Sequence, residues 1–286
     1  MLTETRPMDN MKLSFDLPQE DELGTCLLTG GMYSPYMSLY LMRNEQEYRS
    51  YQTMRKDFVP AEHIKCWTRA FEYLCMKLRV RNVLEKLKER AVTSSASLPR
   101  PGRLLLKSPC HTGRIRHLLN LYPNAQFVYI HRDPIEVFLS SAHMANTTYG
   151  YMFLQRPNEG DLKEYILRQG EILIEEYISC VDDHVNGQLK LGKNLVEVSF
   201  RDLTENPYET IESIYQNLEG MEKVFSENSA ASPSSYPKRL KQYCESNLKG
   251  YKRNKFDSSK LSDELLQEIE TRWKIQFERY KYPSPC

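Results

Sequence analysis

The sequence predicts an α/β fold in which a parallel sheet is flanked by helices. Short apolar runs at Leu104–Leu106 and Phe127–Ile130 have the composition of parallel strands that are buried on both faces. Each run is followed by a signal for a helix start, so strand and helix alternate twice between residues 103 and 144. Because open α/β sheets bind ligands at the carboxyl ends of their strands, we expect the functional site in this stretch.

Both helix starts are marked by capping residues. Ser108 is the expected N-cap after the first strand, and Pro109 is the expected first helical residue. Asp133 and Pro134 repeat this pattern after the second strand, and Glu136 stands where a capping box places its carboxylate. Each start therefore directs unpaired backbone N–H groups toward the carboxyl edge of the sheet.

The other elements are helices around this sheet and one more strand. We expect helices at residues 19–27, 60–90, 161–184, 206–217, 237–248 and 262–280, and a third strand at 194–200. Gly30 and Gly31 should end the first helix, and loops are expected at 93–102 and 226–235. Residues 32–42 are packed core or an acceptor groove, with core favoured, and residues 145–160 form a lid or a plain connection.

Length and charge limit the classes of function. The 286 residues are enough for one sizeable domain, so we expect a single domain over residues 1–286. The net charge of +1 gives no global reason to expect nucleic acid or an anionic membrane as a partner, so any anion site must be local. No run approaches the roughly 20 apolar residues of a membrane span, and the first residues lack a signal peptide's apolar middle.

The cysteines and histidines indicate the compartment and argue against zinc. The 7 cysteines include no Cys-x-x-Cys pair and are odd in number, which favours reduced thiols. A soluble, cytoplasmic protein is therefore expected. His111 and His117 are too far apart in sequence to share one helix face as zinc ligands, so we expect no metal.

The first strand–helix junction combines a cation with a candidate base. A helix N-terminus directly after Lys107 would form an anion site with a cation at its rim. His111 falls in the first turn of that helix, where the positive end of the helix dipole favours a neutral imidazole that can accept a proton. Taken alone, each residue is more often a solvated lysine or a structural histidine, but together they favour a functional site.

The second junction offers a phosphate site. Arg132 closes the strand, and Ser140 lies about two turns into the following helix. Arginine supplies a planar fork for phosphate oxygens and serine a small hydrogen-bond donor, a combination that suits a phosphate monoester.

Four segments resemble the sulfotransferase family that uses 3'-phosphoadenosine 5'-phosphosulfate as sulfuryl donor. They are LLLKSPCHTGRIRHLLNLYPNAQFVYIHRDPIEVFLSS, LPQEDE at residues 17–22, VSFRDLTENP at 198–207 and GYKRNKF at 250–256. The resemblance implies a three-layer α/β fold like that of the P-loop nucleoside triphosphate hydrolases. It also implies transfer of a sulfuryl group to a hydroxyl or amine of a small-molecule or carbohydrate acceptor.

The resemblance also implies roles for individual residues. Those expected to bind the donor are Arg132 and Ser140 at the 3'-phosphate, Lys252 and Arg253 in support, and Phe200 near the adenine. His111 resembles the general base that takes the acceptor's hydroxyl proton, and Lys107 resembles the cation that stabilises the transferring group. Such chemistry requires mainly in-line positioning and charge stabilisation, so no metal is expected.

One family motif is missing from this sequence. The family opens with a strand and a glycine-containing loop, similar to PRSGT or PKSGT, whose backbone binds the 5'-phosphosulfate. Gly30-Gly31 is the only double glycine, and it lacks a preceding strand and a neighbouring Lys or Arg. We therefore expect a truncated member without the first strand and this loop.

Two alternatives to truncation remain open. One is a catalytically impaired form that only binds nucleotide or a protein partner, and the other is an enzyme that rebuilds the site with other residues. A P-loop kinase is disfavoured because GxxxxGK[ST] is absent. The sequence specifies neither the acceptor nor the oligomeric state.

Overall fold

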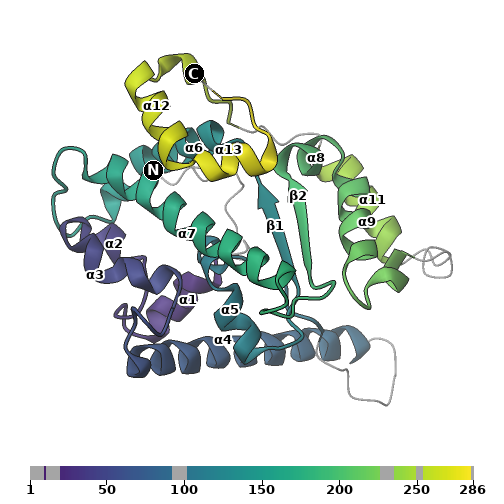
Figure 1. The fold of residues 1–286 in the computed structure, drawn as a ribbon. Coiled ribbons are helices and arrows are strands. Elements are labelled where there is room, and N and C mark those ends of the chain that lie inside the picture. Colours follow the sequence, from purple (N-terminus) through teal and green to yellow (C-terminus); the bar gives the residue numbers. More distant parts are fainter. Residues whose placement is uncertain (1–9, 11–19, 92–101, 226–234, 249–253, 285–286) are drawn as a thin grey trace. The chain divides into compact units, whose positions relative to one another are not determined.

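The computed structural model describes residues 10, 20–91, 102–225, 235–248 and 254–284 (Figure 1). The chain divides into two compact units. We call Pro18–Arg114 with Phe153–Asn158 the helical unit. We call Ile115–Met152 with Glu159–Cys286 the sheet unit.

The helical unit is built around a long helix. Its elements are α1 (Asp21–Leu28), α2 (Met37–Tyr40), η1 (Met42–Asn44), α3 (Glu45–Tyr48), η2 (Arg49–Gln52), α4 (Ala61–Ala91) and η3 (Pro109–Gly113). Trp67 and Phe71 of α4 are buried and stack with ring centroids 4.9 Å apart. Gly30 and Gly31 have φ of 66° and 85°, which lets the chain turn sharply after α1, as predicted.

The sheet unit alternates strands and helices. Its elements are α5 (Ile115–Leu121), β1 (Phe127–His131), α6 (Pro134–Thr148), η4 (Tyr149–Tyr151), α7 (Asp161–Val185), β2 (Leu195–Ser199), α8 (Phe200–Glu205), α9 (Pro207–Asn217), η5 (Glu222–Phe225), α11 (Tyr236–Asn247), η6 (Ser258–Lys260), α12 (Asp263–Arg272) and α13 (Lys274–Tyr280). The predicted strands at 127–130 and 194–200 and the helices over 161–184, 206–217 and 237–248 are confirmed.

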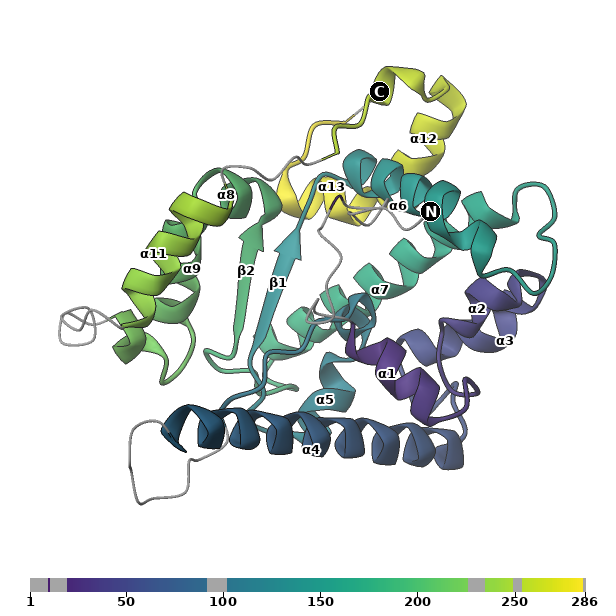
Figure 2. The same cartoon turned by 180° about the vertical axis from the view of Figure 1, so that it is seen from behind.

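β1 and β2 pair in parallel, with Tyr129 opposite Glu197 and His131 opposite Ser199. Side chains alternate along a strand, so these residues share one face of the sheet. α7 packs on that face, and Tyr177 of α7 stacks on Tyr129 with ring centroids 3.9 Å apart. In Figure 2 the strands lie in front of α7. The core of the unit therefore lies between α5, α7 and this face.

The other face of the sheet corrects one expectation. Val128 and Ile130 of β1 are exposed, whereas we expected both faces to be buried. The apolar run alone could not distinguish the two cases, because it has no alternation of apolar and polar residues.

The strand expected at Leu104–Leu106 does not form. Residues 102–108 carry no strand assignment, and Leu105 is exposed. A strand needs a neighbouring strand to pair with, and within the described residues no strand pairs with this segment. Within the residues that the structure describes, the sheet consists of the two strands β1 and β2. The protein therefore has a helix-rich α/β fold with a small parallel sheet.

Three helix boundaries also differ from expectation. The helix after Ser108 is the short 3₁₀ helix η3, with Pro109 first as predicted, and the Ser108 hydroxyl accepts no cap hydrogen bond. α6 runs on to Thr148, through part of the loop expected from residue 145. The final helix breaks at Trp273 into α12 and α13. Residues 93–101 and 226–234, expected as loops, lie outside the described residues.

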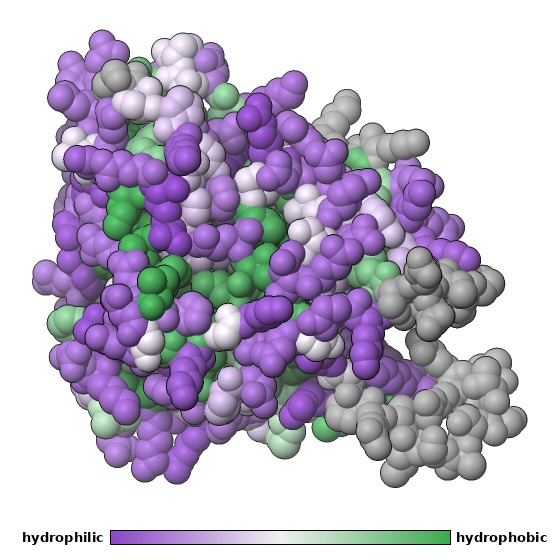
Figure 3. Space-filling model, turned by 45° about the vertical axis from the view of Figure 1, so that its right-hand side comes forward, coloured by the Kyte–Doolittle hydropathy of each residue, from purple (hydrophilic) through white to green (hydrophobic). Residues whose placement is uncertain are grey.

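The Tyr- and Met-rich segment at 32–42 contributes to the core. Ser34, Ser38, Leu39 and Met42 are buried, which favours the packed core that we preferred over a groove. No helix in the described part of the chain is long and apolar enough to cross a membrane. Hydrophilic side chains cover most of the surface that Figure 3 shows, and apolar side chains gather in patches between them.

Candidate functional site

Three consecutive acidic residues at the start of α1 each meet a basic residue of segment 107–114, within the helical unit. We call these pairs the acid–base ladder. They are Glu20 with Lys107, Asp21 with His111, and Glu22 with Arg114. The backbone N–H of Asp21 also donates to the carbonyl of Lys107 at 3.4 Å. LPQEDE is therefore the segment that pairs with both candidate catalytic residues.

The Glu22–Arg114 pair is completely buried. Both side chains are 0% exposed, and the Arg114 guanidinium lies 4.6 Å from the Trp67 ring centroid. Ser34 donates its hydroxyl to Glu22 at 2.6 Å, and Arg114 donates through Nη2 to the carbonyl of Tyr51 at 2.6 Å. Burial alone would lower the pKa of Arg114, but the Glu22 carboxylate raises it. This pair supports the fold and is closed to substrate.

Asp21 and His111 form the middle pair of the ladder. His111 Nε2 lies 2.8 Å from Asp21 Oδ2, and the two side chains are 16% and 4% exposed. The carboxylate oxygens of Asp21 and both ring nitrogens of His111 are buried, and within the described residues none of them forms a hydrogen bond of standard geometry, so the contact is an ion pair. A carboxylate in this position can orient an imidazole that acts as a base. The sequence analysis missed Asp21, although three acids in a row and basic residues at 107, 111 and 114 were the available signal.

The two neighbours of His111 in this segment behave differently. Lys107 is exposed, and its ammonium group pairs with Glu20, whose carboxylate also accepts from the Tyr36 hydroxyl. A surface pair of this kind exchanges partners readily. Cys110 is fully buried, and burial raises the pKa of its thiol to about 12. Lys107 is therefore available as a cation, and Cys110 is not a nucleophile.

The sheet unit brings two predicted donor-binding residues together. Arg132 follows β1 and Phe200 follows β2, so both lie at the carboxyl ends of the parallel strands. The Arg132 guanidinium carbon lies 4.5 Å from the Phe200 ring centroid, which is a cation–π contact. Arg132 Nε also donates to Glu136 Oε2 at 2.8 Å. The guanidinium is thus held by an aromatic ring and one carboxylate.

Helix α6 adds further anion-binding features beside Arg132. Asp133 caps the helix by accepting the backbone N–H of Glu136 at 3.1 Å, and Pro134 is the first helical residue, as predicted. Ser140 lies four residues after Glu136, so both side chains lie on one helix face. The positive end of the helix dipole lies at this end of α6 and favours an anion there.

A cluster of aromatic residues lies at the same end of the strands. His131 Nδ1 is 2.7 Å from the Tyr282 hydroxyl, and the His131 ring stacks on Tyr280 with centroids 4.1 Å apart. The Tyr280 hydroxyl donates to Glu197 Oε1 at 3.0 Å. Burial lowers the pKa of His131 and raises the pKa of Tyr282 to about 12. Sequence reasoning missed this cluster, because its members come from distant segments.

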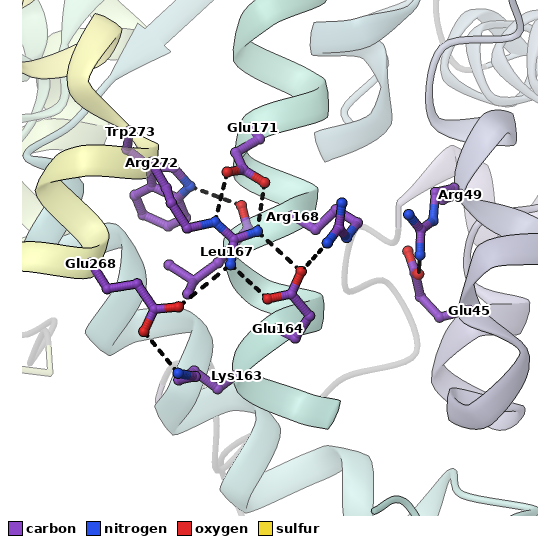
Figure 4. Close-up of polar contacts among 10 residues, drawn as sticks. All are labelled: Glu45, Arg49, Lys163, Glu164, Leu167, Arg168, Glu171, Glu268, Arg272 and Trp273. Atoms are coloured by element: carbon purple, nitrogen blue, oxygen red, sulfur yellow. Dashed lines mark hydrogen bonds and ion pairs between the residues drawn. The ribbon is translucent and has the colours of Figure 1, made fainter. Parts of the chain in front are cut away.

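Helix α12 is fixed to α7 by ion pairs and by a buried indole (Figure 4). Arg272 pairs with Glu164 and with Glu171, both at 2.6 Å. Trp273 Nε1 donates to the carbonyl of Leu167 at 2.9 Å, and a Cβ on Gly170 would come within 2.4 Å of its ring. These contacts hold the start of α13, and α13 carries Tyr280 to the ends of the strands.

The remaining predicted residues divide as follows. Lys107 and His111 belong to the helical unit, whereas Arg132, Ser140 and Phe200 belong to the sheet unit. Lys252 and Arg253 lie outside the described residues. No group of three His, Cys, Asp or Glu side chains suited to a metal ion occurs among the residues that the structure describes.

Comparisons with known proteins indicate the family of the chain. The model of the sulfotransferase family matches residues 32–222, which include parts of both units. Two relatives from Mycobacterium bovis and Mycobacterium tuberculosis are named omega-hydroxy-beta-dihydromenaquinone-9 sulfotransferase Stf3. Each is 26% identical over 296 residues, which cover 100% of this chain and 64% of the relative. No solved structure matches significantly. The family model covers more than half of the chain, and the chain therefore belongs to the sulfotransferase family.

Proposed function

We propose that this protein transfers a sulfuryl group from 3'-phosphoadenosine 5'-phosphosulfate to a hydroxyl acceptor. Family membership supports the reaction class. The observation that carries the choice of donor is the contact between Arg132 and Phe200 at the carboxyl ends of two parallel strands. This contact places a cation that can bind a phosphate beside an aromatic ring that can stack on a nucleobase. Both lie at the edge of the sheet where parallel α/β sheets bind nucleotides.

In this proposal Arg132 binds the 3'-phosphate of the donor. Its Nε is engaged by Glu136, so its Nη groups are the ones offered to phosphate oxygens. Ser140 adds a hydroxyl donor from α6, and the N-terminus of α6 adds positive potential. We propose Phe200 for the adenine and assign Lys252 and Arg253 a supporting charge. The donor is a co-substrate, and no metal is proposed.

The acceptor oxygen forms the new bond to sulfur while the bond from sulfur to the bridging phosphate oxygen breaks. His111 takes the proton of the acceptor hydroxyl, and Lys107 stabilises the negative charge that develops on the sulfuryl oxygens. Adenosine 3',5'-bisphosphate leaves with the electron pair of the broken bond. Asp21 holds the ring of His111 during this step.

A hydroxyl acceptor on a small molecule is supported by the names of the two mycobacterial relatives, which specify an omega-hydroxy compound. The chain spans 64% of the length of these relatives, so we propose a hydroxyl acceptor without assigning their specific acceptor to this chain. We keep the proposal of one domain over residues 1–286, since the family match includes parts of both units. A reducing, cytoplasmic setting is supported by Cys26, Cys110 and Cys180, which are not part of a disulfide bond.

The test measures binding of adenosine 3',5'-bisphosphate by calorimetry and sulfuryl transfer to a panel of hydroxyl acceptors. We expect Arg132→Ala to weaken binding at least about tenfold, as for other charge-assisted hydrogen bonds. His111→Ala should bind normally and lose on the order of 10²- to 10⁴-fold in kcat.

Arg201→Ala is the matched control. Arg201 lies next to Phe200 and forms an Arg–Glu pair of the same spacing, with Glu205 at 3.4 Å. It should bind the bisphosphate as the wild type does. Equal affinity in the wild type and Arg132→Ala would refute the proposed donor site.

A further inference from the structure

Helix α4 has apolar side chains on two opposite faces. Trp67 and Phe71 are buried on the inner face. Tyr73, Met76, Val80 and Leu84 are 47–53% exposed. Their spacings of three and four residues place these four on one face, which we call the α4 strip. A helix that only covers a core would carry polar residues at these positions.

A shallow depression extends the strip toward the start of α4. It is lined by Leu28 of α1 and by Glu62, Lys65, Cys66, Arg69, Ala70 and Tyr73 of α4, with a volume of about 430 Å³. Apolar side chains and basic groups therefore lie next to one another on this surface.

The strip is flanked by positive charge. Between residues 61 and 88, α4 carries seven Lys or Arg and three Glu, although the whole chain has a net charge of only +1. Lys65, Arg69 and Lys77 lie beside the strip by helical periodicity, and the Lys77 ammonium is 5.6 Å from the Tyr73 ring centroid. Of the three acids, Glu62 and Glu85 already face Lys65 and Arg81. The basic excess of the chain is thus concentrated on this helix.

We propose that the α4 strip docks on an anionic membrane surface, with the helix axis in the plane of the headgroups. Tyr73, Met76, Val80 and Leu84 would enter the boundary between headgroups and acyl chains. The flanking Lys and Arg side chains would extend along them to the lipid phosphates. The helix is about 46 Å long, so many headgroups meet it at once.

The charge pattern favours a membrane over two other partners. A second copy of the chain would bring two helices with a basic excess against each other, and like charges oppose such a dimer. Nucleic acid would be attracted to the lysines and arginines but gives no reason for four exposed apolar side chains between them. An anionic lipid surface matches both features.

This inference goes beyond sulfuryl transfer and does not depend on it. A soluble enzyme acting on a water-soluble acceptor has no need of such a face. Docking at a membrane would give the active site access to hydroxyl acceptors that are dissolved in lipid.

The experiment measures flotation of the whole chain with vesicles of phosphatidylcholine and phosphatidylglycerol, against vesicles of phosphatidylcholine alone. We expect the anionic vesicles to bind at least tenfold more protein. Binding should weaken as salt rises from about 0.1 M to about 1 M, where the screening length falls to about 3 Å. The double variant Met76→Glu, Val80→Glu should lose at least tenfold in binding.

Val185→Glu is the matched control, because Val185 ends α7 in the sheet unit and is 78% exposed. It should bind vesicles as the wild type does. Arg69→Glu, Lys77→Glu is a second test on exposed side chains, used if the first variant melts early in circular dichroism, and it too should lose at least tenfold.

Equal binding to both kinds of vesicle would overturn the proposal, and so would wild-type binding by the strip variants. A dimer in sedimentation that Val80→Glu dissociates would instead assign the strip to a second copy.

Discussion

Two arginine–glutamate pairs of this protein differ in what surrounds them. Arg114 and Glu22 in the helical unit are both 0% exposed, and the guanidinium also contacts Trp67 and the carbonyl of Tyr51. Arg132 and Glu136 in the sheet unit are 18% and 50% exposed. An enclosed pair cannot change partners without unfolding, whereas a half-open pair can exchange its carboxylate for a phosphate. Burial, and not residue type, separates the structural arginine from the candidate ligand-binding one.

The largest expected effect comes from opening the enclosed pair. Arg114→Met should lower the free energy of unfolding by about 3–5 kcal/mol, because Glu22 would be left buried without a counter-charge. Arg132→Met should cost no more than about 1 kcal/mol, as for exposed pairs. Urea unfolding of both variants measures the difference. Equal losses would show that the two arginines do not differ in this way.

A variant of the Asp21–His111 pair would show whether the buried Asp21 carboxylate contributes to catalysis by orienting His111. Asp21→Asn should reduce kcat about 10- to 100-fold, since the asparagine amide can donate to Nε2 and stabilise the wrong tautomer of His111. The KM for the donor should stay the same. Steady-state kinetics measure kcat and KM, and the kcat of His111→Ala gives the lower limit expected when the base is lost. An unchanged kcat would mean that Asp21 does not orient the base.

The partly exposed Arg132–Glu136 pair leads us to expect a variant that binds the nucleotide more tightly. Glu136→Gln should raise the affinity for adenosine 3',5'-bisphosphate about 3- to 10-fold, because it removes a negative charge that competes for Arg132. Glu205→Gln, which alters the exposed pair with Arg201, should leave the affinity unchanged. Calorimetry decides between these outcomes, and weaker binding by Glu136→Gln would mean that Glu136 positions Arg132 productively.

The smallest effect concerns pH and again depends on burial. Burial lowers the pKa of His131, so the unfolded chain binds its proton more readily than the folded chain does. Stability should therefore fall as the pH drops below about 6.5, the usual value for histidine. His131→Gln should make the decrease smaller between pH 7 and pH 5 in urea unfolding. An identical pH dependence in both proteins would contradict this assignment.

Local signals in the sequence were sufficient for many elements. The cap at Asp133 and Pro134 correctly placed α6, and the apolar spacing from Pro60 correctly predicted α4, because both signals involve residues a few positions apart. Leu104–Leu106 failed as a strand because a strand is defined by its neighbour, and no local pattern states whether one is present.

The site shows the same division. Resemblance to the family pointed to Arg132 and Phe200. In the structure the two side chains are in contact at the ends of neighbouring strands, although the paired strand residues Phe127 and Leu195 are 68 positions apart in sequence. Asp21 escaped notice because its partner His111 is distant in sequence, and the acidic run was read as a helix start and as a family-like segment, with no partner assigned to it. The Tyr282 contact with His131 depends on the packing of α13, which the sequence does not encode in any short motif.

The acid–base ladder has a consequence for folding during synthesis. Residues 20–22 leave the ribosome long before their partners at 107, 111 and 114 have been made. Helix α4 lies between them and can form early from local contacts, but Glu22 has no compensating cation until Arg114 emerges. The first acidic turn must therefore stay solvated, and the helical unit can close around it only after residue 114 has emerged.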